Sequence, residues 1–158
     1  MEKVVQVTRV YPAAIAQVWA TWTEPELIKR WWGPALFTCP QARIDFREGG
    51  VSLVAMQAPE QMGNTVFYSI WEYKKIVPHE RIELIQNLAD AAGNKMNPVQ
   101  LNMPADFPED VLTVITFKDL GNNQTELTVT EHADFGQMSH FAQLGLEQSL
   151  DKMGKIFA

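Results

Sequence analysis

The chain has 158 residues, of which 46% are hydrophobic and 20% are charged. This balance excludes an intrinsically disordered chain and a polytopic membrane protein, and the length predicts one domain over residues 1–158. Thirteen lysines and arginines against nineteen acidic residues give a formal net charge of -6, so we expect no nucleic-acid partner, because a phosphate backbone requires the opposite sign.

Cysteine content and hydropathy indicate where the protein resides. Cys39 is the only cysteine, which rules out an intrachain disulfide and a cysteine-based zinc site. No uninterrupted apolar segment approaches the roughly 20 residues that a membrane-spanning helix needs, and the first residues lack the apolar core and cleavage site of a secretory leader. We therefore expect a reducing, cytoplasmic location and no insertion into a membrane.

The first element in chain order is a predicted strand, followed directly by a helix. Residues Val4 to Tyr11 are rich in valine and alternate loosely, as a strand does. Pro12 ends the strand and opens a helix, where its fixed φ and missing N–H cost least. The apolar residues that follow at helical spacing are Ile15, Val18, Trp19 and Trp22.

A second short helix follows the first one immediately. Thr23 is predicted to cap it, with Glu26 reaching back to Thr23 and Pro25 in the first turn. Gly33-Pro34 ends this helix. The N-terminal third of the chain is therefore predicted to be one strand and two helices.

From residue 37 to residue 131 the pattern changes to strands separated by turns. The predicted strands cover residues 42–47, 51–57, 65–77, 81–88, 111–117 and 125–131. Residues 89–110 contain Gly93, three prolines and several asparagines and aspartates, which predict a loop excursion instead of a strand. A loop of this length inside a domain often covers a functional surface.

A long amphipathic helix is predicted at the end of the chain. Asp134 is predicted to cap it, and it reaches to about Phe157, a length of roughly 33 Å. Charged and polar residues (His140, Glu147, Asp151) share the side opposite to its apolar residues. The order strand, two helices, six strands, helix predicts an α+β fold in which a curved antiparallel sheet buries the apolar side of this helix.

Small residues near the middle of the inward side of this helix predict a cavity between helix and sheet. Ala142, Gly145 and Ser149 leave space there, whereas Met138 and Met153 are large side chains toward the two ends. The alternative is that Ala142 and Gly145 only allow the helix to approach the sheet closely. Pockets do form between packed layers of this kind.

Short motifs spread over nearly the whole chain match one known protein family. They include Thr23-Glu24-Pro25-Glu26-Leu27, Trp31-Trp32-Gly33-Pro34, Ile44-Asp45-Phe46-Arg47-Glu48-Gly49-Gly50, Ile76-Val77-Pro78-His79-Glu80-Arg81-Ile82 and Glu147-Gln148-Ser149-Leu150-Asp151-Lys152-Met153. The sequence resembles the stand-alone bacterial, AHSA1-type members of the family named for the activator of Hsp90 ATPase, within the START-like (helix-grip) superfamily. One departure is Leu146, where relatives often carry a tryptophan, and this smaller side chain enlarges the expected cavity.

The resemblance implies a curved sheet that grips the C-terminal helix (β-α-α-β6-α) around an apolar pocket. It does not imply one activity, because the superfamily includes lipid and hormone carriers, polyketide cyclases and dehydratases, oxygenase domains and co-chaperones. A function taken from the fold alone would be an association only.

The residues expected to line this pocket come from strands on opposite sides of the helix. Trp71 and Tyr73 share one face of their strand, but the sequence leaves open which face points inward. Glu131 shares its face with Leu127 and Val129; if it is buried, its pKa is raised and it could act as an acid or base, and if it is exposed at the strand end it has no such role. The complete expected lining is Trp32, Met56, Trp71, Tyr73, Gln86, Glu131, Met138, Ala142 and Gly145.

The sequence contains no motif of cofactor or metal chemistry. We find no histidine and carboxylate spacing of a metal site, no nucleophile elbow, no P-loop and no dinucleotide fingerprint, so we expect no metal and no cofactor. Cys39 has no evident histidine partner and is interpreted as a buried, inert thiol. Catalytic residues stay unknown on these grounds.

Three functions are consistent with these observations. The favoured one is a binding module for a small apolar molecule. The alternative is an enzyme of the cyclase or dehydratase type that uses the same pocket, for which Glu131, Gln86 and Tyr73 are the candidate polar groups. A co-chaperone that contacts an Hsp90-type chaperone through its surface is less favoured, and the acidic surface permits a homodimer.

Overall fold

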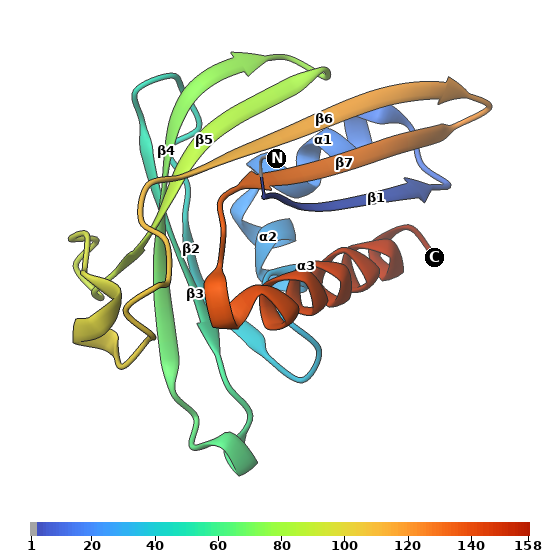
Figure 1. Cartoon of the computed structure of the whole chain (residues 1–158). Coiled ribbons are helices and arrows are strands. Elements are labelled where there is room, and N and C mark those ends of the chain that lie inside the picture. The colour runs from blue at the N-terminus through green and yellow to red at the C-terminus, as the bar shows by residue number, and fades with distance from the viewer. Residues whose placement is uncertain (1–2) are drawn as a thin grey trace.

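One curved antiparallel sheet of seven strands forms the framework of the protein, in the order β1-β7-β6-β5-β4-β3-β2 (Figure 1). The computed structural model describes residues 3–158. The first strand pairs with the last, so β1 and β2 form the two edges of the sheet. The strands are β1 (Val5–Tyr11), β2 (Thr38–Arg43), β3 (Val51–Gln57), β4 (Val66–Val77), β5 (Arg81–Ala89), β6 (Val111–Gly121) and β7 (Gln124–His132).

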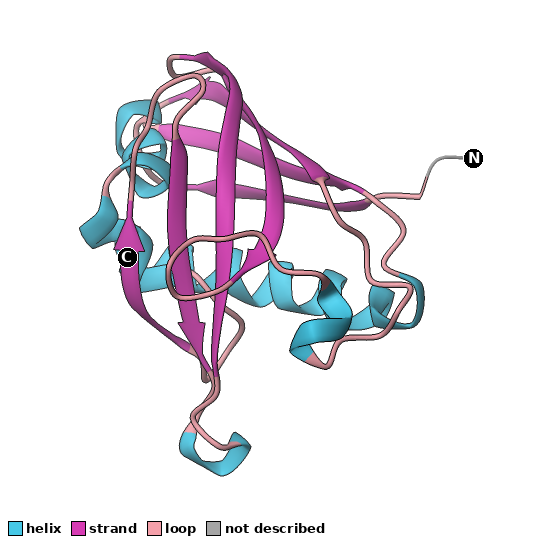
Figure 2. Cartoon of the chain, turned by 90° about the vertical axis from the view of Figure 1, so that its left-hand side faces the viewer, coloured by secondary structure: helices cyan, strands magenta, loops and turns pink. Residues whose placement is uncertain are grey.

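Three α-helices complete the fold and confirm the predicted order of elements. They are α1 (Ile15–Thr23), α2 (Pro25–Trp31) and α3 (Ser139–Gly154), with short 3-10 turns at η1 (Glu60–Met62), η2 (Pro98–Leu101), η3 (Gly136–Met138) and η4 (Lys155–Phe157). In Figure 1 the sheet bends so that β1, β6 and β7 pass over α3 while β2 to β5 run steeply to one side. Figure 2 shows the long helix crossing behind the curved surface of strands. The α+β helix-grip prediction is therefore confirmed.

Hydrogen bonds hold α3 between the two ends of the sheet. On one side, the hydroxyl of Tyr11 at the end of β1 donates to the carbonyl oxygen of Leu150 at 2.7 Å. On the other side, Lys152 Nζ donates to the carbonyl oxygens of Gly33 and Phe37, both at 3.0 Å, in the segment between α2 and β2. The helix thus closes the concave side of the sheet.

The start of the last helix differs from the prediction. The α-helix begins at Ser139 and has 16 residues, a length of about 24 Å at 1.5 Å per residue. Asp134 does not cap it; its carboxylate accepts a hydrogen bond from the Gly136 N–H at 2.8 Å. A 3-10 turn therefore precedes the α-helix, since Asp134 satisfies a donor of this turn.

The cap predicted for the second helix is also wrong. Thr23 is the last residue of α1, and Glu24 is the N-cap of α2 without a side-chain hydrogen bond. Pro25 occupies the first turn of α2, as predicted. Because a single residue separates the two helices, Thr23 cannot leave α1 to cap the next helix.

The strand predicted over residues 42–47 lies instead at 38–43 as β2. Beyond Arg43 the backbone leaves the ladder, and the N–H of Asp45 donates to Ser52 Oγ at 3.1 Å. Ile44 and Phe46 still pack against the core from this irregular segment. The alternation of apolar residues that suggested a strand therefore reflects the packing of Ile44 and Phe46 against the core. It does not reflect pairing with a neighbouring strand.

The register of the sheet decides which face of β4 points inward. Trp71 lies opposite Ser52 on β3 and opposite Gln86 on β5. Trp71 and Tyr73 are each 1% exposed and belong to the hydrophobic core, which also contains Trp22. This face is therefore the concave one, which answers the question that the sequence leaves open.

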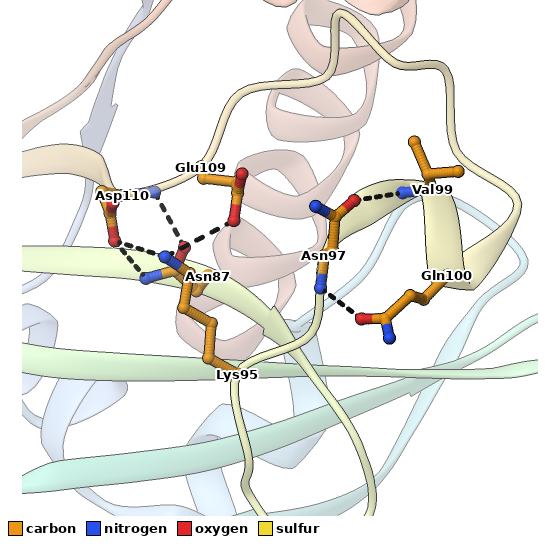
Figure 3. Close-up of polar contacts among 7 residues, drawn as sticks. All are labelled: Asn87, Lys95, Asn97, Val99, Gln100, Glu109 and Asp110. Carbon is orange, nitrogen blue, oxygen red and sulfur yellow. Dashed lines mark hydrogen bonds and ion pairs between the residues drawn. The ribbon is translucent and has the colours of Figure 1, made fainter.

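Residues between β5 and β6 form the predicted excursion, which contains the 3-10 turn η2 (Figure 3). Its two ends are tied together, because Asn87 Nδ2 donates to Asp110 Oδ1 at 3.0 Å and the Asp110 N–H donates to Asn87 Oδ1 at 2.8 Å. Lys95 Nζ lies 3.1 Å from Asp110 Oδ1 and 3.4 Å from Glu109 Oε1. The excursion is thus held to the sheet by polar contacts at its base.

Candidate functional site

Glu131 stands on the concave face of the sheet near the end of β7. Its cross-strand neighbours are Thr113 on β6 and Val5 on β1, and both are buried. Directly opposite residues of an antiparallel pair point to the same face, and Val5 belongs to the core. Glu131 therefore points to the concave face of the sheet.

The carboxyl group of Glu131 lies in an environment that disfavours its charge. Burial raises the pKa of Glu131 to about 7 from the ordinary value of 4.5. Within residues 3–158, no group donates a hydrogen bond to it and no charged group counts among the causes of the pKa change. The side chain still keeps part of its surface accessible. The side chain of Glu131 is thus half-buried at the end of β7.

Four tryptophans form a continuous cluster beside this face. Trp71 contacts Trp22 and Trp32, with ring centroids 5.8 Å and 5.0 Å away. Trp31 packs on Trp22 at 4.6 Å, and its Nε1 donates to the carbonyl oxygen of Thr21 at 2.7 Å. The indole N–H groups of Trp22 and Trp71 are buried and find no hydrogen-bond partner among residues 3–158. Two unused donors in a core are unusual, because burying such a group without a partner costs about 1–3 kcal/mol.

Tyr73 is occupied by a structural contact. Its hydroxyl shares a hydrogen bond of 2.7 Å with Ser52 Oγ, and its ring packs edge-on against Phe46 at 5.0 Å. Burial raises the pKa of Tyr73 to about 12. The hydroxyl therefore has a fixed partner and a poor capacity for proton transfer near neutral pH.

Four other residues of the expected lining are half-buried on different elements. Gln86 is half-buried on β5 opposite Trp71, and Met56 is half-buried on β3 opposite Phe67. Met138 lies in η3 and Ala142 in α3, where both pack against the core and remain half-buried. Gln86 and Met56 thus lie on the sheet, and Met138 and Ala142 on the segment that covers it.

Gly145 lies on the side of α3 that faces Pro34. A Cβ built on it would lie 3.4 Å from Pro34 Cγ, an ordinary van der Waals contact. Ser149, one turn later, donates its hydroxyl proton to the carbonyl oxygen of Gly145 at 2.9 Å. The neighbour of Gly145 is thus Pro34, in the segment between α2 and β2, and not a strand of the sheet.

Thr113 is a concave-face residue that the sequence analysis did not single out. It is buried, lies directly opposite Glu131, and donates weakly to the carbonyl oxygen of Val111 at 3.4 Å. Its alternation with Ile115 and Phe117 is visible in the sequence. A register shift between Asp119 and Gly121 separates this pair from the turn between β6 and β7, so counting back from the turn alone would have placed Thr113 opposite His132.

The surface carries two open depressions. One, of about 470 Å³, lies between the start of β1 and the start of α3 and includes Val5, Ala133 and Gln143. The other, of about 430 Å³, includes Arg30, Leu36 and Lys152. Neither contains any residue of the expected lining.

Metal binding and membrane spanning find no support in the part of the chain that the structure describes. Residues 3–158 contain no group of three histidine, cysteine or acidic side chains arranged to hold a metal ion. None of the helices in this range combines the length and the apolar character needed to cross a membrane.

Comparison with solved structures identifies the fold. A crystal structure of a Chromobacterium violaceum protein matches with a TM-score of 0.78 and 22% identity, over 98% of this chain and 96% of that one. An Arthrobacter aurescens protein solved by NMR matches with a TM-score of 0.79 and 18% identity, over 98% and 85% of the two chains. The AHSA1 protein of Silicibacter pomeroyi matches with a TM-score of 0.75 and 15% identity, over 98% and 96%. At these identities the likeness establishes the fold alone.

Sequence comparison identifies the family. No curated protein matches the sequence. The profile described as "Activator of Hsp90 ATPase homolog 1-like protein" matches residues 12–158, which is nearly the whole chain. The resemblance noted in the sequence motifs is thereby confirmed. With its seven-stranded sheet closed around α3, this chain belongs to the AHSA1 family of Activator of Hsp90 ATPase homolog 1-like proteins.

Proposed function

We propose that the protein is a binding module for a small, mostly apolar molecule held between the concave face of the sheet and α3. The family and the fold support a generic ligand-binding or chaperone-associated module. The observation that supports the finer proposal is Glu131, a largely buried side chain for which residues 3–158 provide no hydrogen-bond or ion-pair partner. Such a group needs either internal water or a bound molecule beside it.

The composition of the surrounding wall supports an apolar guest. Trp32 and Ala142 pack against the core and Met56 lies on β3, and all three are only half-buried, so each has surface left to cover. Covering apolar surface is worth about 25 cal/mol per Å², and a ligand can supply this. Small-molecule sites are commonly apolar walls with a few polar groups that orient the ligand.

The binding proposal is tested by filling the space from α3. The variant Ala142→Phe should abolish binding of the fluorescent probe N-phenyl-1-naphthylamine, while Phe141→Trp should leave it unchanged, because Phe141 is 62% exposed on the outer side of the same helix. Native mass spectrometry of freshly purified protein gives a second readout, a retained small molecule. Equal probe binding by the wild type and Ala142→Phe would contradict the proposal. If Ala142→Phe fails to fold, Met56→Phe fills the space from the β3 side.

An enzyme of the cyclase or dehydratase type is a second candidate because of Glu131. A carboxyl group with a pKa of about 7 can act as a general acid or base near neutral pH. Tyr73 is a weaker candidate, since its hydroxyl is engaged by Ser52. For this candidate, Glu131→Gln should remove turnover of a cyclisable polyketide mimic, and unchanged turnover would exclude Glu131 from the chemistry.

A further inference from the structure

The concave face around Glu131 offers a single negative charge in an apolar setting. Its neighbours along and across the strands, Val5, Val129 and Val111, are buried and apolar. The polar side chains nearest in register, Thr113 and Gln86, are neutral. A carboxylate without a partner in such a place is costly, and buried charges in proteins are normally paired.

The cations on the elements packed against this face are engaged elsewhere. Lys3, before β1, lies 3.4 Å from the carboxylate of Asp134. Arg9 on β1 pairs with Asp151 of α3 at 2.8 Å. Lys152 on α3 donates to three backbone carbonyl oxygens of residues 33, 34 and 37.

The remaining titratable groups on these elements do not compensate Glu131 either. On α3, Glu147 accepts from Gln143 at 3.4 Å, and His140 is exposed and packs against Phe141. His132 follows Glu131 on β7, where alternation points it to the opposite face, and it is exposed. The described part of the chain therefore supplies no positive charge to this carboxyl group.

We propose that the molecule bound under α3 carries a protonated amine and that Glu131 accepts this group inside the apolar space. The inference rests on the proposed binding function, because it needs the same space between sheet and helix. An ammonium group supplies both the missing positive charge and hydrogen-bond donors, and charge-assisted hydrogen bonds are about twice as strong as neutral ones. A hydroxyl group supplies only the donor, and a carboxylate is repelled.

Three probes of equal chain length separate these head groups. We would titrate the full-length protein with n-decylamine, decan-1-ol and decanoate at pH 8, below their aggregation limits, and follow tryptophan fluorescence and calorimetric heat. Trp32 and Trp71 lie beside the space and report its occupation. Decylamine should bind at least tenfold more tightly than decanol, which corresponds to about 1.4 kcal/mol, and decanoate should bind most weakly.

Two variants test whether Glu131 causes the preference for the amine. Glu131→Gln keeps the shape but not the charge, so it should reduce the amine-to-alcohol affinity ratio to about one while decanol binding persists. Glu126→Gln is the matched control, because Glu126 lies on β7 five residues earlier and on the opposite face. A ratio unchanged in Glu131→Gln, or decanoate as the tightest probe, would overturn the inference.

Proton release on ligand binding is expected if Glu131 contacts the amine, and it is not expected if Glu131 has only a structural role. At pH 7 an arriving ammonium group stabilises the carboxylate and lowers the pKa of Glu131, so decylamine binding should release protons into the buffer, visible as a heat that varies with buffer ionisation enthalpy. Decanol should release none. If none of the three probes binds the wild type, the proposed function fails together with this inference; if all bind equally, only the amine preference fails.

Discussion

Replacing Glu131 by glutamine should stabilise the folded protein, and only at pH values where the carboxyl group would ionise. In the unfolded chain this group has a pKa near 4.5, whereas burial raises the pKa of Glu131 to about 7 in the folded state. Below pH 4.5 both states hold the proton. As the pH rises from 4.5 to 7, the unfolded chain loses the proton first, so the folded state loses stability, and this loss is complete above pH 7.

The magnitude follows from the two pKa values. A change from 4.5 to about 7 corresponds to about 3 kcal/mol at pH 8, since one pKa unit is worth about 1.4 kcal/mol. Glutamine does not ionise, so Glu131→Gln avoids this loss while it keeps a similar volume. For a chain of this length, about 3 kcal/mol corresponds to a rise in Tm of about 6–12 °C.

The assay is urea unfolding of the wild type and Glu131→Gln at pH 4.5 and pH 8, followed by tryptophan fluorescence. The free energy of unfolding of Glu131→Gln relative to the wild type should rise by about 3 kcal/mol between the two pH values. Glu126→Gln, on the other face of β7, should stay within about 0.5 kcal/mol of the wild type at both. If the relative stability of Glu131→Gln is the same at pH 4.5 and pH 8, the carboxyl group is hydrated and the reasoning is refuted.

Three further predictions concern the attachment of α3 and the cysteine. Tyr11→Phe removes the 2.7 Å hydrogen bond to Leu150 and should lower the free energy of unfolding by about 1 kcal/mol in urea titrations, whereas Tyr68→Phe should have little effect because Tyr68 has no hydroxyl contact within residues 3–158. Lys152→Met leaves three carbonyl oxygens without their donor and should cost about 1–3 kcal/mol; an unchanged Tm would mean that water replaces the ammonium group. Burial raises the pKa of the Cys39 thiol, so its reaction with a disulfide reagent at pH 8 should be at least tenfold slower in the folded protein than in urea.

The order of elements could be predicted from the sequence because each element carries its own periodicity. The alternation of Arg81–Ala89 and the helical spacing of Ile15–Thr23 are local properties, and both elements occur where expected. Residues 42–47 show the limit of this reasoning. Alternating burial of Ile44 and Phe46 looks like a strand, but strand pairing depends on the neighbouring chain, and the Ser52 hydroxyl takes the N–H of Asp45 instead.

Which side chains lie together at the candidate site depends on how strands distant in the sequence pair. No local sequence pattern provides this register. Trp71 and Tyr73 could have faced either side of β4, and only their pairing with β3 and β5 places them in the core. Glu131 is a clearer case. At the end of a strand the sequence favours neither burial nor exposure, and the pairing of Glu131 with Val5 and Thr113 turns the carboxyl group inward. A register shift by one residue would have exposed it.

The presence of glutamate at position 131 argues for a role other than stability. The same face is apolar at Leu127 and Val129, and an uncharged residue at 131 would avoid a loss of about 3 kcal/mol at pH 8. The net free energy of unfolding of a domain is only about 5–15 kcal/mol, so the loss at position 131 is a large fraction of it. Positions where a sequence breaks its own apolar pattern without a structural partner are typically functional. A bound cation would supply the missing partner and recover part of this stability, which links the pH dependence of unfolding to the chemistry of the guest.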